Sequence, residues 1–152
     1  MYTVKGVKSF RGREGHGFEC SLYKDGKKIG TVTDHANGGE VDFYLNDGEK
    51  EHLDAHCASL PLEPCVHEFM KKDYPDGYPV SCDALLCRLV DEFETHKRNK
   101  RVCKTKTMVK VVEKGKDTFY TYPAKFSIAL RDAIKDRDYP NTDVIFMNEV
   151  YS

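Results

Sequence analysis

The chain has 152 residues, about the length of one ordinary domain, and its 24 Lys and Arg nearly balance its 25 Asp and Glu to leave a formal net charge of -1. With 39% hydrophobic residues, 11 Gly and 6 Pro, its composition excludes collagen-like and largely disordered chains. No run approaches the roughly 20 continuous apolar residues of a membrane span, so a cytoplasmic protein with no membrane partner is expected, and its six cysteines are expected to be thiols.

The first part of the chain is predicted to form an antiparallel meander. Residues 2–10 read as a strand, and two strand-like runs in 18–33 flank Asp25-Gly26. This dipeptide is typical of a two-residue hairpin turn, because both positions need a positive φ. Centring the turn there predicts the pairs that share the core face. They are Phe18 with Thr33, Cys20 with Thr31 and Leu22 with Ile29.

A further strand and a helix are predicted to complete this part. Apolar residues alternate in 41–45, which indicates a strand. Asp47 is predicted to cap the helix that follows, with acidic residues in its first turn at the positive end of the helix dipole. The apolar face of this helix is expected to comprise Leu53, Cys57 and Leu60.

A longer helix is predicted next. Ser81 has the side chain of an N-cap, and apolar residues follow it at a spacing near 3.6. They are Cys82, Leu85, Leu86, Leu89, Val90 and Phe93. The helix is expected to end in the basic segment 96–101, because cations suit the negative end of the helix dipole.

A second hairpin, a helix and a final strand are predicted to follow. Apolar residues in 108–112 and the segment 118–122 flank a Lys114-Gly115-Lys116 turn. Pro123 is predicted to start a helix, and residues 144–147 to form a buried final strand. The apolar face of this helix is expected to comprise Phe126, Leu130, Ala133 and Ile134.

Together these elements predict an α+β fold, and the prolines indicate how it is divided. Four of the six prolines lie in 61–79, which is therefore predicted to connect a sheet-and-helix lobe, 1–60, with a helix-hairpin-helix-strand lobe, 80–152, inside one compact unit. The charge is divided as well, since residues 1–76 carry a net -4 and residues 77–152 a net +3.

Three residues among the glycines of segment 11–17 are candidate binding residues: Arg11, Arg13 and His16. Glycines let backbone N–H groups converge on an anion, and a guanidinium matches a phosphate. However, the segment does not lead from a strand into a helix, as a nucleotide-binding P-loop does. The alternative is a flexible loop with solvated arginines.

Residues 96–116 carry nine Lys and Arg against one Glu, a net +8. Clustered cations of this kind contact phosphates, and nearby aromatic residues could stack on bases. The candidate binding residues are Lys97, Arg98, Lys100, Arg101, Lys104 and Lys106. The alternative is a solvated strand face, because Lys104, Lys106 and Lys110 would share one side of a strand.

Zinc ligands are a further candidate: His52, His56, Cys57, Cys65 and His67. His52 and His56 have i, i+4 spacing on one helix, which suits a shared metal ion. The helix lacks the Glu that metalloproteases place after the first His, and no CxxC pair is present. Cys57 reads more simply as a small core residue. No metal or other cofactor is therefore assigned.

No hydrolase, kinase or nuclease signature occurs, so a protein without enzymatic activity is favoured. The opening segment 4–12, together with 22–28 and Asn37-Gly38-Gly39, resembles small accessory proteins of phages and prophages. The resemblance implies interaction with a host protein or defence system. The leading hypothesis is a binding protein that inhibits a bacterial defence or nucleic-acid-handling complex. The alternatives are a nucleotide or nucleic-acid binding module and a zinc-stabilised interaction module.

Overall fold

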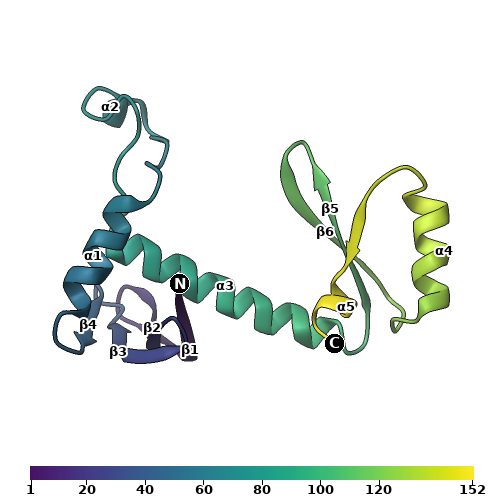
Figure 1. The fold of residues 1–152 in the computed structure, drawn as a ribbon, viewed down its shortest axis with the longest axis horizontal. Helices are drawn as coiled ribbons and strands as arrows, with labels where there is room; N and C mark the ends of the chain where they lie inside the picture. The colour runs from purple at the N-terminus through teal and green to yellow at the C-terminus, as the bar shows by residue number, and fades with distance from the viewer. The chain divides into compact units, whose positions relative to one another are not determined.

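The chain folds into two antiparallel sheets, each covered by helices, as the computed structural model of residues 1–152 shows (Figure 1). The α+β class predicted from the sequence is confirmed, with the strand meander in the N-terminal part. The two sheets belong to two units, Met1–Glu94 and Thr95–Ser152, and each unit has a hydrophobic core of its own.

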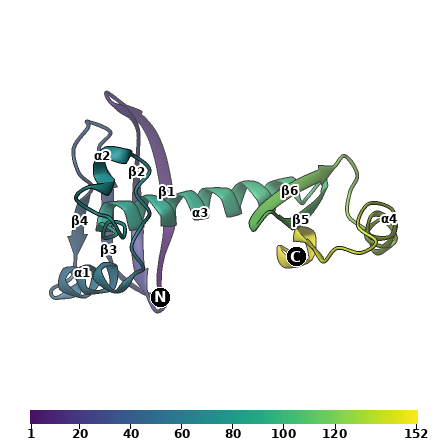
Figure 2. The same ribbon diagram turned by 90° about the horizontal axis from the view of Figure 1, so that it is seen from above.

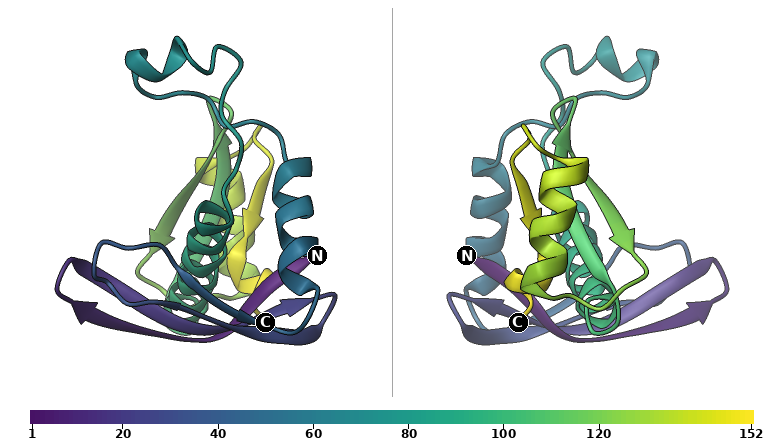
Figure 3. Two further views of the ribbon diagram at one scale, coloured as in Figure 1. Left: turned by 90° about the vertical axis from the view of Figure 1, so that its left-hand side faces the viewer. Right: turned by 90° about the vertical axis from the view of Figure 1, so that its right-hand side faces the viewer.

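The first unit holds a four-stranded sheet in the order β1-β2-β3-β4. Its elements are β1 (Tyr2–Gly12), β2 (Gly15–Lys24), β3 (Lys27–Asp34), β4 (Asp42–Leu45), α1 (Glu49–Ser59), α2 (Glu68–Lys71) and the beginning of α3 (Cys82–Val102). Helices α1 and α3 lie on the same face of this sheet (Figure 3). Between sheet and helices the side chains of Leu22, Val32, Leu53 and Leu86 are fully buried, which makes this layer the core of the unit.

The β2-β3 hairpin turns at the predicted dipeptide, but its register differs from the prediction. Asp25 and Gly26 both have a positive φ, as the turn requires. The predicted pair Leu22 with Ile29 is wrong, because a β-bulge leaves Ile29 unpaired and places Leu22 opposite Gly30. The shift moves Val32 into the core, where Thr31 and Thr33 were expected. Gly30 is required there because a Cβ would lie 2.3 Å from the Tyr44 carbonyl oxygen of β4.

The helix starts of the first unit are partly as predicted. Ser81 caps α3, since its Oγ accepts a hydrogen bond from the Ala84 N–H at 3.1 Å. Asp47 does not cap α1, because the N-cap position falls on Gly48, whose φ of 77° makes the turn into the helix.

The boundary between the two units lies elsewhere in the chain than the sequence predicted. Residues 61–79 lie inside the first unit, whose core includes Leu86 and Val90 of α3.

The second unit holds a three-stranded sheet in the order β6-β5-β7. Its elements are the end of α3, then β5 (Thr107–Glu113), β6 (Lys116–Tyr122), α4 (Ile128–Asp138), β7 (Val144–Phe146) and α5 (Met147–Val150). Helix α4 lies alongside one face of the sheet (Figure 1). There Ile134 packs with Val109, Val111 and Phe146, and these four buried side chains form the core.

Helix α4 begins later than predicted. Its N-cap is Ser127, whose Oγ accepts a hydrogen bond from the Leu130 N–H at 3.1 Å, so Pro123 lies outside the helix. Leu130 and Ile134 face the core as expected, whereas Ala133 is exposed. At the end of the helix, Arg137 and the Tyr122 hydroxyl lower the pKa of the Asp138 carboxyl to about 2. This carboxylate therefore joins α4 to β6 at neutral pH.

The two units differ sharply in charge. The first contains 11 Lys and Arg against 18 Asp and Glu, a net -7, and the second contains 13 against 7, a net +6. The boundary between the units thus separates the charges more completely than a division between residues 76 and 77, which gives -4 and +3.

None of the helices combines the length and the apolar character needed to cross a lipid bilayer.

Candidate functional site

The segment that holds Arg11, Arg13 and His16 is a hairpin turn together with the paired strand ends that flank it. β1 continues to Gly12 and β2 begins at Gly15, so that Arg11 pairs with His16 across the ladder. Figure 2 shows this turn extending beyond the ends of β3 and β4. The backbone N–H groups of the paired residues belong to strand pairing, and the segment does not form the loop of converging N–H groups that the glycines suggested. Arg11 and Arg13 are exposed on it.

His16 faces an acidic cavity rather than a phosphate-binding one. The cavity has a volume of about 340 Å³, and its acidic lining consists of Asp34, Asp91 and Glu94. Three carboxylates around one space repel an anion. The surroundings of His16 therefore disfavour phosphate. Arg11, Arg13 and His16 belong to the first unit, and the basic segment 96–116 belongs to the second. Neither unit therefore holds both candidate binding surfaces.

Four of the predicted basic residues come together at the end of α3. Lys97, Lys100, Arg101 and Lys104 line one hollow of about 240 Å³, which we call the basic hollow. Their spacing of i, i+3, i+4 and i+7 places them on one side of the helix and of the turn that prolongs it. Arg98 and Lys106 are exposed but do not line the hollow. Sequence reasoning thus identified the cluster and included two residues that lie outside it.

The strand face expected for Lys104 and Lys106 does not exist. β5 begins only at Thr107, and both lysines lie in the turn between α3 and β5. In this turn the Lys104 N–H donates to the Arg101 carbonyl at 3.2 Å, and the Lys106 N–H donates to the Val102 carbonyl at 2.9 Å. The turn therefore continues the helical path, which brings Lys104 to the same side as Lys97.

No carboxylate of the second unit neutralises the basic hollow. Four of its carboxylates are held by other cations: Asp117 by Lys110, Asp132 and Glu149 by Arg131, and Asp138 by Arg137. None of the four cations of the hollow takes part in an ion pair within this unit. The negative end of the α3 dipole amounts to only about half a charge. Four positive charges outweigh it, so the hollow attracts anions.

Asn148 of α5 anchors the turn that carries Lys104. Its Oδ1 accepts a hydrogen bond from the Met108 N–H at 2.9 Å, and its Nδ2 donates to the carbonyls of Cys103 at 3.0 Å and Lys106 at 2.8 Å. The side chain is 8% exposed, and every hydrogen-bonding group it reaches lies at the junction of α3 and β5. Sequence reasoning missed this residue, because an Asn after an apolar strand carries no signal of its partners.

The five candidate zinc ligands contact different neighbours. His52 Nδ1 lies 3.1 Å from the Lys24 Nζ, and His56 packs on the ring of Tyr2. Cys65 donates to the Tyr74 carbonyl, and His67 stacks on Phe69. The Cys57 Sγ lies 3.4 Å from the Cys82 Sγ. The structure therefore does not assemble these side chains into one ligand set, and it contains no cluster of three or more groups suited to a metal.

The basic hollow is thus the site where four of the nine predicted binding residues converge, and its chemistry is that of an anion-binding surface. No family model, curated protein or solved structure matches the chain in the comparisons with known proteins. The case for a function depends on the residues themselves. Four unpaired cations line the basic hollow, and such an arrangement prefers anions such as phosphates.

Proposed function

We propose that the chain is a non-enzymatic binding protein whose second unit binds the phosphate backbone of nucleic acid through the basic hollow. The observation that carries the proposal is the convergence of Lys97, Lys100, Arg101 and Lys104 without carboxylate partners in their unit. Lys and Arg contacts to phosphate release condensed counterions, and this release supplies most of the free energy of non-specific nucleic-acid binding.

The spacing of the four cations favours a polymer over a single nucleotide. From Lys97 to Lys104 the chain rises about 10 Å along the helix axis, at roughly 1.5 Å per residue. Phosphates of one DNA strand follow each other every 3.4 Å or so along the duplex axis, so this length spans about three intervals, that is, about four phosphates. No aromatic side chain lines the hollow. The surface is therefore suited to the backbone and not to reading bases.

The salt dependence of binding tests the proposal. Fluorescence anisotropy of labelled single- and double-stranded oligonucleotides should report binding that weakens steeply between 50 and 200 mM salt. For four phosphate contacts we expect log K to fall against log salt with a slope of about -3.6 for duplex and about -2.8 for single strands. Unchanged anisotropy at the lowest salt for both oligonucleotides would reject the proposal.

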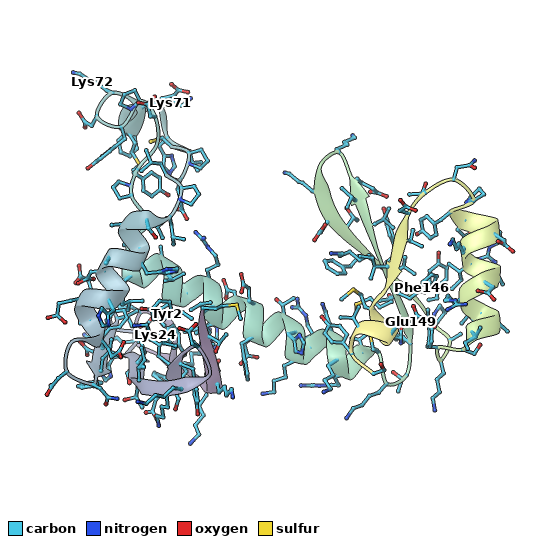
Figure 4. All side chains as sticks on the ribbon, in the orientation of Figure 1. Tyr2, Lys24, Lys71, Lys72, Phe146 and Glu149 are labelled. Atoms are coloured by element: carbon cyan, nitrogen blue, oxygen red, sulfur yellow. The ribbon has the colours of Figure 1, made fainter.

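A second candidate function, binding to a partner protein, is favoured by a different surface. The segment 64–77, which we call the apolar loop, projects beyond α1 in the first unit (Figure 1). It exposes large apolar side chains: Val66 is 81% exposed, Phe69 75% and Tyr74 46%. Lys71 and Lys72 lie at its far end (Figure 4). Exposed apolar groups gathered on one projecting segment are typical of an interaction site.

The base of the apolar loop is held closed. Glu63 and Tyr78 exchange two backbone hydrogen bonds of 2.9 Å, and the Tyr78 hydroxyl donates to the Glu63 carboxylate at 3.1 Å. Arg88 of α3 pairs with the same carboxylate. The prolines of 61–79 further restrict the chain. A restrained loop loses less conformational entropy on binding, so this loop is suited to enter an apolar groove of a partner protein, such as a component of a nucleic-acid-handling complex.

Paired capture experiments test this second function. We expect the wild-type chain to retain a stoichiometric protein partner from bacterial lysate, and the Val66→Ser/Phe69→Ser variant to lose it. The matched control is Ile128→Ser, which replaces a side chain of similar exposure, 64%, in the second unit and should leave capture unchanged. Equal capture by all three proteins would show that the apolar loop does not carry the interaction.

A further inference from the structure

Two thiols from different helices meet beside a cavity of the first unit. Cys57 lies near the end of α1, Cys82 is the first residue of α3, and their sulfur atoms are 3.4 Å apart. Both are free thiols. The cavity has a volume of about 470 Å³, and Cys82 is part of its lining. Cys82 is therefore open to a small molecule, whereas Cys57 is 4% exposed and lies behind it. The charged side chains of the cavity lining are Lys50 and four carboxylates, those of Glu40, Asp42, Asp54 and Asp83.

The surroundings of Cys82 determine its state at neutral pH. Its Sγ donates a hydrogen bond to the Asp54 Oδ1 at 3.1 Å, and the Lys50 Nζ, which pairs with Asp54, lies 4.0 Å from the same sulfur. Burial, and then the hydrogen bonds to Asp54 and Cys57, raise the pKa of the Cys82 thiol. Cys82 is therefore held mainly as a protonated thiol, which must lose its proton before its sulfur can attack a disulfide.

We propose that Cys57 and Cys82 are an oxidisable pair, which a low-molecular-weight disulfide entering the cavity converts into an intramolecular disulfide. The sulfur atoms are 3.4 Å apart and need to approach by about 1.4 Å to reach bonding distance. Both residues lie at helix ends, one in the last turn of α1 and the other at the start of α3.

The reaction proceeds in two exchanges. First the Cys82 thiol loses its proton to hydroxide from the solvent in the cavity, and the thiolate, 4.0 Å from the Lys50 ammonium, attacks the small disulfide; one small thiolate leaves and takes a proton from water. The product is a mixed disulfide at Cys82. The Cys57 sulfur then attacks the Cys82 sulfur of that bond, forms the Cys57–Cys82 disulfide and releases the second small thiol. Two protein thiols are oxidised and one small disulfide is reduced to two thiols.

The new bond would close a ring around the apolar loop. Residues 58–81 lie between the two cysteines, and they include the loop with its Glu63 and Tyr78 base. A disulfide that closes such a ring restricts the unfolded chain. We therefore expect oxidation to raise the Tm of the first unit by several degrees. Reduction by excess thiol should reverse the change.

Incubation of the full chain at pH 8 with cystamine, a cationic disulfide suited to a cavity lined mostly by carboxylates, tests the proposal. Peptide mapping after alkylation should recover Cys57 linked to Cys82. The Cys57→Ser variant should stop at a cysteamine adduct on Cys82. The matched control is Cys87→Ser, which removes an exposed cysteine of the same helix and should leave the linked peptide unchanged.

Several outcomes would overturn the proposal. One is persistence of the cysteamine adduct on Cys82 in the wild-type chain, since Cys57 would then be unable to displace it. Others are recovery of both cysteines as free thiols, or a link between another pair. Mapping of the wild-type chain decides among these even if the Cys57→Ser variant does not fold.

Discussion

Replacing Lys97, Lys100, Arg101 and Lys104 together by alanine should weaken binding to a duplex oligonucleotide by about 10³-fold at 50 mM salt and flatten its salt dependence. The reason is that these four side chains are the cations that the proposed complex places against the phosphates. All four are exposed, so the variant should keep its fold, and its circular dichroism spectrum and Tm should match those of the wild type. Anisotropy with the same labelled duplex measures the effect.

A matched variant removes the same number of charges from the first unit. Arg11, Arg13, Lys27 and Lys28 are exposed at the turns of β1-β2 and β2-β3, and replacing them by alanine also lowers the net charge by four. If binding depends on the basic hollow, this control should bind within a few-fold of the wild type. Strong loss in the control with little loss in the first variant would move the site to the hairpin turns of the first unit.

The Asn148→Ala variant should lower the free energy of unfolding of the second unit by about 3 kcal/mol, since it leaves the buried Met108 N–H and two carbonyls without partners. Urea unfolding followed by circular dichroism, with amide exchange of β5, measures the loss. Asn148→Asp should also destabilise the unit, because a carboxylate would face the carbonyl oxygens of Cys103 and Lys106. The turn that carries Lys104 would lose its anchor in both variants.

The control for this prediction is Asn141→Ala, which replaces an exposed side chain in the same unit. It should change the free energy of unfolding by less than about 0.5 kcal/mol. Equal stability of the Asn141→Ala and Asn148→Ala variants would contradict the role given to the Asn148 hydrogen bonds.

Local turn chemistry is what made much of the fold predictable from the sequence. Asp25-Gly26 and Lys114-Gly115 both adopt the positive φ values of hairpin turns, because few other dipeptides tolerate them. The bulge at Ile29 escaped prediction, since it depends on Gly30 packing against the β4 backbone and not on the hairpin itself. Pro123 was misleading because a proline suits a loop as well as the first turn of a helix.

The candidate site, like the fold, could be predicted from the sequence only in part. The cluster at the end of α3 was predictable, because residues three and four apart on a helix share a side whatever the tertiary structure is. The separation of Lys106 from that cluster depends on where β5 begins, which the sequence marks weakly. The meeting of Cys57 with Cys82, and of Asn148 with the carbonyl of Cys103, joins segments far apart in the chain. No local pattern encodes such contacts.

The division of charge between the units has a consequence for how the protein would meet a long polyanion. At distances beyond a Debye length of about 8 Å the chain presents little field of its own, because -7 and +6 nearly cancel. At close range the net charge of the second unit is attracted to the polymer and the net charge of the first unit is repelled by it. The basic hollow therefore favours contact with the polymer, whereas contact of the apolar loop with the polymer is disfavoured, which leaves this loop to a protein partner.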